Sequence, residues 1–341
     1  MTQFSISRVF KNTALAIAAL AAGAVSTSGS ARAQATGQTG LLGYDDLSFF
    51  EEGLATDLGG AVLRFNFLLD QAYIDNPPPG ADDWNTTLQF STAIRGELSN
   101  GWFTGVAYTG IFDTDDLNGN DRHLYSVFVD APWGKLSLGR VTGLLENTVA
   151  RRNRVGNATL AAGRGLGTLN ETGLHYVRAV NAYEIHLAID EEGDAQAGLF
   201  FEAPIGTGAH TFGIRGGTGK VQHRTPAAGT GDIEELAGFY GYTLGSLSVG
   251  AELGMQDISL TGALASMSQR YASLGTNYKV GRTSLSAELG WSRFMATTSR
   301  SAGLGFRYDI ARGFSGNLGL NYIDAGATDT WRIPVSIRYE F

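Results

Sequence analysis

The sequence predicts an all-β fold, a transmembrane antiparallel β-barrel of about 16 strands. Three observations predict it. Apolar and polar residues alternate at period two along many ten-residue segments, as they do in strands with one polar face. Tight turns and long polar loops alternate between those segments. Glycine is abundant, at 47 of 341 residues, aromatic residues make up 11%, and mean hydropathy is −0.05, a composition typical of barrel strands.

The first 33 residues have the pattern of a secretory signal peptide. Arg8 and Lys11 form a basic start, an apolar run covers 14–25, and Ala31 and Ala33 mark a small-residue cleavage site. The apolar run is too short for a transmembrane helix. Removal of the signal peptide takes away three of the 25 basic residues and none of the 33 acids, which leaves a mature net charge of −11. So acidic an exported chain is a poor candidate for nucleic-acid binding.

Residues 34–59 follow as an N-terminal periplasmic segment of unknown structure. Ser48 and Glu51 fit a capping box for a short helix that would continue past Leu54 and Leu58, and an extended tail is the alternative. The barrel is expected over residues 60–341. The chain has no cysteine, which excludes disulfides and thiolate metal sites.

The strands follow from the alternation. Near the C-terminus, for example, Ile333, Val335 and Ile337 alternate with Ser336 and Arg338. The predicted strands are 60–71, 84–98, 101–112, 121–131, 134–140, 171–178, 181–190, 197–205, 209–217, 233–243, 246–256, 270–279, 282–292, 301–310, 313–322 and 331–341.

The connections separate a membrane barrel from a soluble β-sandwich, whose strands also alternate. Along the chain, every second connection between predicted strands is a tight turn, such as 99–101, 244–245 and 280–281. Short turns at one rim and long loops at the other are typical of outer-membrane barrels. The long polar loops interleaved with the tight turns lie at 72–83, 113–120, 218–232 and 257–269.

A barrel of about 16 strands encloses an aqueous channel, so its inward faces should carry polar residues. Aromatic residues on the apolar faces near strand ends fit the aromatic girdles of such barrels. The predicted inward residues are Arg64, Asn66, Asp70, Asn85, Thr87, Gln89, Ser91, Arg95, Glu184, His186, Ser248, Glu252, Asn317 and Asn321. The predicted girdle residues are Trp102, Tyr108, Tyr240, Tyr242, Trp291, Tyr308, Tyr322, Tyr339 and Phe341.

Three stretches carry a family resemblance. Residues 125–140 contain the turn Pro132-Trp133-Gly134 and end in Leu-Gly-Arg, the connection 141–170 is the longest of the chain, and the last residue is Phe341. With these features the mature chain resembles, from about Gly60 onward, the general diffusion porins of the Gram-negative outer membrane, in the style of alphaproteobacteria. The resemblance implies a homotrimer in the outer membrane, embedded in lipid and lipopolysaccharide, through which small polar solutes and ions diffuse passively.

The resemblance also implies a constriction between a third loop folded into the lumen and a basic cluster on the opposite wall. Arg64, Arg95 and Arg140 match the wall arginines, although strict alternation aims Arg140 outward unless its strand bends. The third-loop segment contributes Glu146, Arg151, Arg152, Arg154 and Arg164.

The third-loop arginines leave two hypotheses about ion selectivity open. If they face the lumen, they favour anions and disfavour cations, which gives a weakly anion-preferring pore. If they instead hydrogen-bond the folded loop to carbonyls or inward acids, selectivity is near neutral.

The expected outer loops carry surplus acid. Asp113, Asp115 and Asp116 resemble a calcium loop in composition, but their spacing does not fit an EF-hand. A solvated acidic rim is favoured over a weak divalent site, with Ca²⁺ or Mg²⁺ loosely bound and bridging to lipopolysaccharide phosphates as the alternative. No other cofactor is expected.

Two further functions compete with the porin. An outer-membrane barrel enzyme is disfavoured because neither a Gly-x-Ser-x-Gly elbow nor a His-Glu-x-x-His pair occurs, so we expect no enzyme. A sugar-specific channel would need a row of aromatic residues along the lumen. Most aromatic residues are instead predicted to face outward, with Phe103, Phe128 and Phe200 as the inward exceptions, which favours a general pore.

Overall fold

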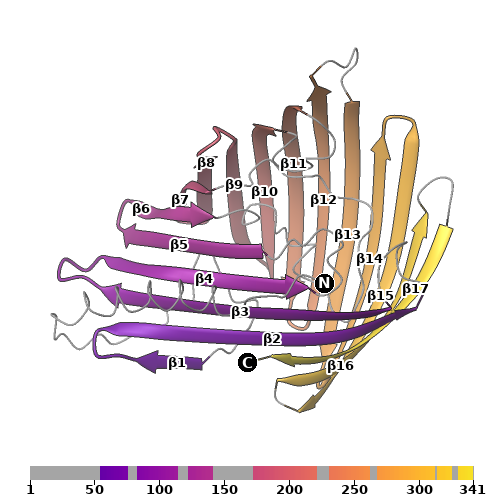
Figure 1. Ribbon diagram of the computed structural model, residues 1–341, viewed down its shortest axis with the longest axis horizontal. Coiled ribbons are helices and arrows are strands. Elements are labelled where there is room, and N and C mark those ends of the chain that lie inside the picture. The colour runs from indigo at the N-terminus through magenta and orange to yellow at the C-terminus, as the bar shows by residue number, and fades with distance from the viewer. Residues whose placement is uncertain are drawn as a thin grey trace, which may run out of the picture.

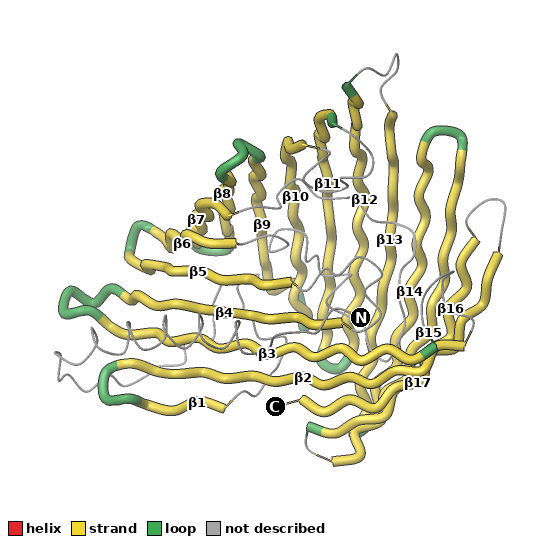
Figure 2. Tube along the Cα trace, viewed as in Figure 1, coloured by secondary structure: helices red, strands yellow, loops and turns green. Residues whose placement is uncertain are grey.

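The computed structural model describes residues 54–75, 83–113, 122–140, 172–220, 230–261, 267–311, 313–324 and 329–340. Within these ranges the chain forms seventeen strands and no helix (Figure 2). The described part therefore holds no helix that is long and apolar enough to cross a membrane. The predicted signal peptide lies outside these ranges. The strands are β1 (Leu54–Asp57), β2 (Ala61–Asp75), β3 (Trp84–Glu97), β4 (Phe103–Asp113), β5 (Arg122–Ala131), β6 (Gly134–Arg140), β7 (Thr172–Val180), β8 (Tyr183–Asp190), β9 (Ala195–Ile205), β10 (Gly208–Lys220), β11 (Gly231–Leu244), β12 (Leu247–Leu260), β13 (Met267–Val280), β14 (Thr283–Phe294), β15 (Thr297–Ala311), β16 (Phe314–Asp324) and β17 (Asp329–Glu340).

Strands β2 to β17 close into an antiparallel barrel of 16 strands. Each pairs with the next along the chain, and β17 returns to β2, with Arg338 opposite Asp70. In Figure 1, β2 to β5 run roughly horizontally and β11 to β14 run roughly vertically. Tilted strands on different walls of a barrel cross in this way. The predicted fold class is confirmed, and each predicted strand corresponds to one observed strand.

Strand β1 was not predicted. Leu54 to Asp57 pair with Phe65 to Val62 of β2, while β17 pairs with Leu68 to Asp75 of the same strand. The two strands thus lie end to end along one edge of β2 (Figure 1). Of the two alternatives for this segment, the helix is wrong at Leu54–Asp57 and the extended chain holds there, because unpaired backbone groups at the start of β2 need partners that a short strand provides. Ser48 and Glu51 lie outside the described residues.

Two-residue connections lie at one end of the barrel, at 132–133, 181–182, 206–207, 245–246 and 281–282. Gly245 and Gly281 have φ of 54° and 57°, the left-handed conformation that opens a tight hairpin turn. The connections at the other end are mostly longer, at 76–83, 114–121, 141–171 and 221–230, although 295–296 is as short as any. The predicted division into two unlike rims is confirmed.

Several strands run further into the long-loop end than the sequence predicted. β10 continues to Lys220, β12 continues to Leu260, and β13 already begins at Met267. The predicted loops 218–232 and 257–269 are therefore too long. At these ends the outward side chains are no longer all apolar, since Glu234 and Asp257 are among them. The alternation of apolar and polar residues therefore stops before the hydrogen-bonded strand does.

Candidate functional site

The described interior wall of the barrel is mostly polar. Residues paired across the strands share a face, so the register gives the direction of each side chain. On β14, Ser284, Ser286 and Glu288 are buried inside, whereas Leu285 and Leu289 are exposed outside. The same division holds on the other strands, and it confirms the inward direction of Arg64, Asn66, Asp70, Asn85, Thr87, Gln89, Ser91, Arg95, Glu184, His186, Ser248, Glu252, Asn317 and Asn321.

The exterior is the apolar face. Exposed side chains there include Leu253 at 67%, Leu304 at 57% and Ile337 at 55%. Aromatic residues lie outward toward the strand ends, among them Tyr278 and Tyr308 near the tight turns and Trp331 near the longer loops. An apolar belt between aromatic girdles is the exterior that a bilayer requires of a barrel. The predicted girdle residues on described strands face outward, and Phe341 lies outside the description.

Two predicted wall arginines come together near the tight-turn rim. Val62 pairs with Arg95 and Arg64 pairs with Ala93, so the two arginines occupy diagonal positions on the inner face. Arg64 is exposed. Arg95 lies 3.5 Å from the carboxylate of Asp130 and places its guanidinium carbon 4.1 Å from the ring centre of Phe103. Both arginines are thus near the strand ends and not at mid-height of the wall.

Arg140 takes the opposite direction. It shares a face with Leu136 and Leu138, which are 40% and 54% exposed, and it pairs with the outward residue Tyr125. Strict alternation therefore holds at Arg140, which is half-buried on the outer side. This orientation gives no support to its predicted place in a pore constriction.

The predicted loop residues lie outside the described ranges. These are Glu146, Arg151, Arg152, Arg154 and Arg164 of the third-loop segment, together with Asp115 and Asp116. Asp113 is the last residue of β4. Among the described residues, no three His, Cys, Asp or Glu side chains are grouped as metal ligands.

A buried charge network spans β10 to β13 on the inner wall. Nη2 of Arg215 donates to Oε1 of Glu235 at 2.8 Å and to Oε1 of Glu252 at 2.9 Å. The Tyr271 hydroxyl donates to the same Glu235 oxygen at 2.6 Å. All four side chains are at most 5% exposed. The network joins four neighbouring strands, and one cation serves two anions.

Glycine makes room for the large members of this wall. Gly254 is the register partner of Tyr271, and a Cβ at Gly254 would overlap the Tyr271 ring. Gly213 bears the same relation to Phe239, and Gly105 to Phe128. The aromatic rings therefore lie flat across the neighbouring strand.

A second polar cluster lies on β7 and β8. Nε2 of His175 and Nδ1 of His186 are 3.2 Å apart, and Nε2 of His186 hydrogen-bonds the Glu184 carboxylate. Phe200 packs edge-on against His186, with ring centres 4.8 Å apart. Lys135 places its ammonium 4.4 Å from the ring centre of Phe128. Both histidines are buried, at 1% and 2% exposed.

Ion pairs also join the strands where the barrel closes. Nε of Arg338 on β17 donates to Asp70 on β2 at 2.9 Å. Nε of Arg307 on β15 donates to Asp309 at 2.8 Å, and its Nη2 donates to Glu340 on β17. These pairs face inward, so the closing seam is linked by charge on its lumen side.

The sequence interpretation missed Arg215, Glu235 and Tyr271. The signal for them was present, because Arg215 has the parity opposite to Phe212 and Ile214, and Tyr271 has the parity opposite to Leu274. Their mutual contacts could not be inferred, because they depend on the register between strands 20 to 56 positions apart in sequence.

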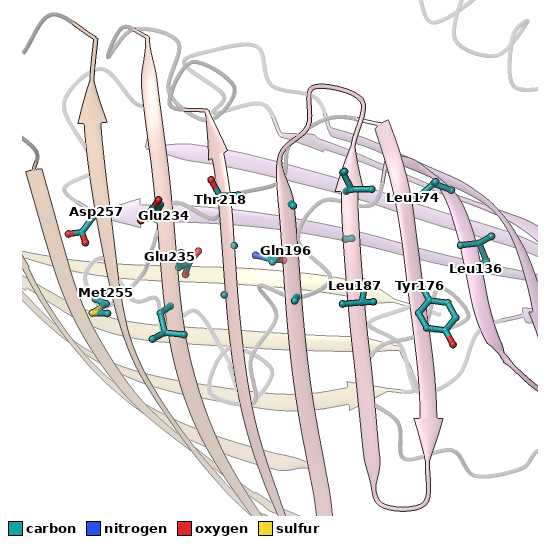
Figure 3. A pocket seen from close by; sticks show the side chains of 17 residues that line it. Leu136, Leu174, Tyr176, Leu187, Gln196, Thr218, Glu234, Glu235, Met255 and Asp257 are labelled. Carbon is teal, nitrogen blue, oxygen red and sulfur yellow. The ribbon is translucent and has the colours of Figure 1, made fainter.

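An apolar hollow of about 820 Å³ lies along the outer side of β6 to β12. Leu136, Leu174, Leu187 and Met255 line it (Figure 3). Ala195, Ala197 and Gly216 also line it. Glu234 and Asp257 lie toward its long-loop end (Figure 3). Because most of its lining residues face outward and the leucines dominate that side, the hollow belongs to the lipid-facing surface and not to the channel.

Comparison with known proteins gives the fold. No protein-family model and no curated protein matches the sequence. Among solved structures, the loop L8 deletion mutant of OmpT, an outer membrane protein of Vibrio cholerae, aligns with a TM-score of 0.65 at 14% identity, over 83% of this chain and 100% of that chain. The anion-selective porin from Comamonas acidovorans aligns with a TM-score of 0.62 at 14% identity, over 82% and 100%. A mutant porin of Rh. blastica aligns at 0.55 and 14% identity, again over 82% and 100%.

These likenesses, together with the closed strand ring, the apolar exterior and the polar interior, establish an integral membrane β-barrel with the fold of the porins and outer-membrane proteins to which it aligns.

Proposed function

We propose that the protein is an outer-membrane porin, which forms a water-filled channel for the passive diffusion of small hydrophilic solutes and ions. The observation that supports this function best is the reversed polarity of the wall. Serine, asparagine, glutamine and charged residues line the inside on all sides, while aliphatic residues cover the outside. Such an interior is compatible with water, as the lumen of a barrel of 16 strands requires.

The inward aromatic residues favour a general channel over a sugar-specific one. Phe128, Phe200, Phe239 and Tyr271 face inward but are 6% exposed or less, because they lie flat on the wall or pack on each other. In the described part of the wall they therefore offer no open file of rings to a passing sugar. The proposal assigns no catalytic activity to the barrel.

A homotrimer is the assembly that we propose. One similar solved structure is described as the trimer form of OmpT from Vibrio cholerae, with a TM-score of 0.63 and 14% identity. Lipid and lipopolysaccharide would surround the trimer, and small polar solutes and ions would cross each subunit.

Ion selectivity depends on charges that the wall does not balance. The described inner wall pairs Arg215, Arg307, Arg338 and Arg95 with neighbouring acids. Arg64 and Arg332 also face inward and are not among these pairs, so a weak preference for anions would rest on them and on Arg151, Arg152, Arg154 and Arg164 of the third-loop segment. The sign of the zero-current potential under a KCl gradient distinguishes this preference from a neutral pore.

Liposome swelling tests the proposed function. We expect purified protein in liposomes to admit neutral sugars at rates that fall smoothly with their size, because a general pore selects by diffusion. Protein-free liposomes are the control. Swelling confined to one sugar would indicate a substrate-specific channel, and no swelling by correctly folded protein would contradict any open pore.

A further inference from the structure

Two arginines face each other on the outside of the barrel, near the long-loop rim. Arg270 of β13 and Arg293 of β14 are direct register partners, and both are exposed. Their Cβ atoms are expected to be about 4.5–5.5 Å apart, and like charges at such positions destabilise a sheet. In the described part of the chain no ion pair reaches either guanidinium.

A third arginine adds to this charge. Arg300 of β15 pairs with Trp291, which places it diagonal to Arg293 on the same outer face. The nearest outward acid on the other side is Asp257, which pairs with Ser268 and is therefore diagonal to Arg270. Asp324 lies opposite Arg300 on β16. The residues directly opposite the Arg270–Arg293 pair are Met255 on β12 and Thr298 on β15, and neither is an acid.

On the tight-turn side of the arginine pair, the outward residues of β13 and β14 become apolar. The next outward pair toward the tight turns is Ala272 with Trp291, and the pair after it is Leu274 with Leu289. Both leucines are largely exposed, at 46% and 55%. A tryptophan between a charged pair and a leucine pair marks the level where headgroups meet acyl chains.

We propose that Arg270 and Arg293, with Arg300 beside them, bind the phosphate of an outer-leaflet lipid whose acyl chains lie against Leu274 and Leu289. A phosphate accepts hydrogen bonds from two guanidinium groups at once, and its negative charge removes the repulsion between them. The long-loop rim of an outer-membrane barrel faces the outer leaflet, where phosphorylated glycolipid is the anionic headgroup that the site would meet. The site thus fixes a phosphorylated lipid at the boundary of β13 and β14.

Lipid binding to the purified full-length protein in neutral detergent tests the proposal. The probe is bisphosphorylated lipid A, and bound lipid is counted by native mass spectrometry. We expect the variant R270Q/R293Q to bind lipid A at least about tenfold more weakly than wild type, because hydrogen bonds to a charged group are lost. The matched control is R178Q/R282Q, which removes two exposed arginines near the tight turns and should bind as wild type does.

Two further arms identify the ligand. Fully dephosphorylated lipid A should bind wild type and R270Q/R293Q alike, and inorganic phosphate at equal concentration should not displace lipid A. Unchanged lipid A binding by R270Q/R293Q, or an equal loss in the control, would overturn the proposal. Displacement by inorganic phosphate would also overturn it, since it would show a site for free anions. Heat-modifiable gel mobility verifies that each variant is folded.

Discussion

Arg215 shows how one residue organises the interior wall. Its guanidinium contacts Glu235 and Glu252 on the two following strands, and each of these side chains is almost fully buried. A buried carboxylate without a partner is costly, so the arginine compensates two such costs at once. The glycine at 254 lets Tyr271 complete the cluster by lying across β12.

Removing that cation should destabilise the barrel more than removing the whole network. We expect R215L to lower the free energy of unfolding by about 3–5 kcal/mol, because it strands two buried carboxylates. Urea unfolding of the protein in lipid vesicles, followed by tryptophan fluorescence, measures the loss. The triple variant R215L/E235Q/E252Q should recover much of it. If R215L unfolded at the same urea concentration as wild type, the network would not stabilise the fold.

The sequence predicted the direction of a side chain, which depends on alternation along one strand. It did not predict contacts between side chains on different strands, which depend on the register. The inward direction of Arg64, Arg95 and Glu252 follows from parity alone, and so does the outward direction of Arg140. The ion pair of Arg215 with Glu252 joins residues 37 positions apart, and no local pattern encodes it.

At the scale of elements, the seam between β17 and β2 closes the barrel. β1 extends β17 along the same edge of β2, and Arg338 bonds Asp70 across the seam. Each predicted strand has at least seven alternating positions, whereas β1 has only the four residues Leu54 to Asp57. So short a segment has no measurable periodicity, which is why it escaped prediction.

The seam ion pair should contribute measurably to stability. We expect D70N to cost about 1.5–3 kcal/mol, because charge-assisted hydrogen bonds at a mostly buried site are lost. The midpoint of heat-modifiable gel mobility reports the change, and R338Q completes a double-mutant cycle. K220Q, which breaks the exposed rim pair Lys220–Asp232, is the matched control and should cost less than about 1 kcal/mol. Equal effects of D70N and K220Q would show that the seam pair has no special role.

At the scale of the whole molecule, the fold was accessible from sequence because it is a sum of many weak and consistent signals. Alternating faces, tight turns at one rim and longer loops at the other all require the same closed barrel. The arrangement of the third-loop segment is different, since nothing periodic fixes where Arg151 or Arg154 lies. We propose that its charges bias selectivity, so selectivity has to be measured.

Single-channel recording in a planar bilayer tests the central claim, an open aqueous channel, most directly. Under a tenfold KCl gradient we expect purified protein to give large stepwise conductances, in groups of three if the assembly is a trimer. The zero-current potential then reports whether anions are preferred. A correctly folded, heat-modifiable barrel that gave no conductance would contradict the account.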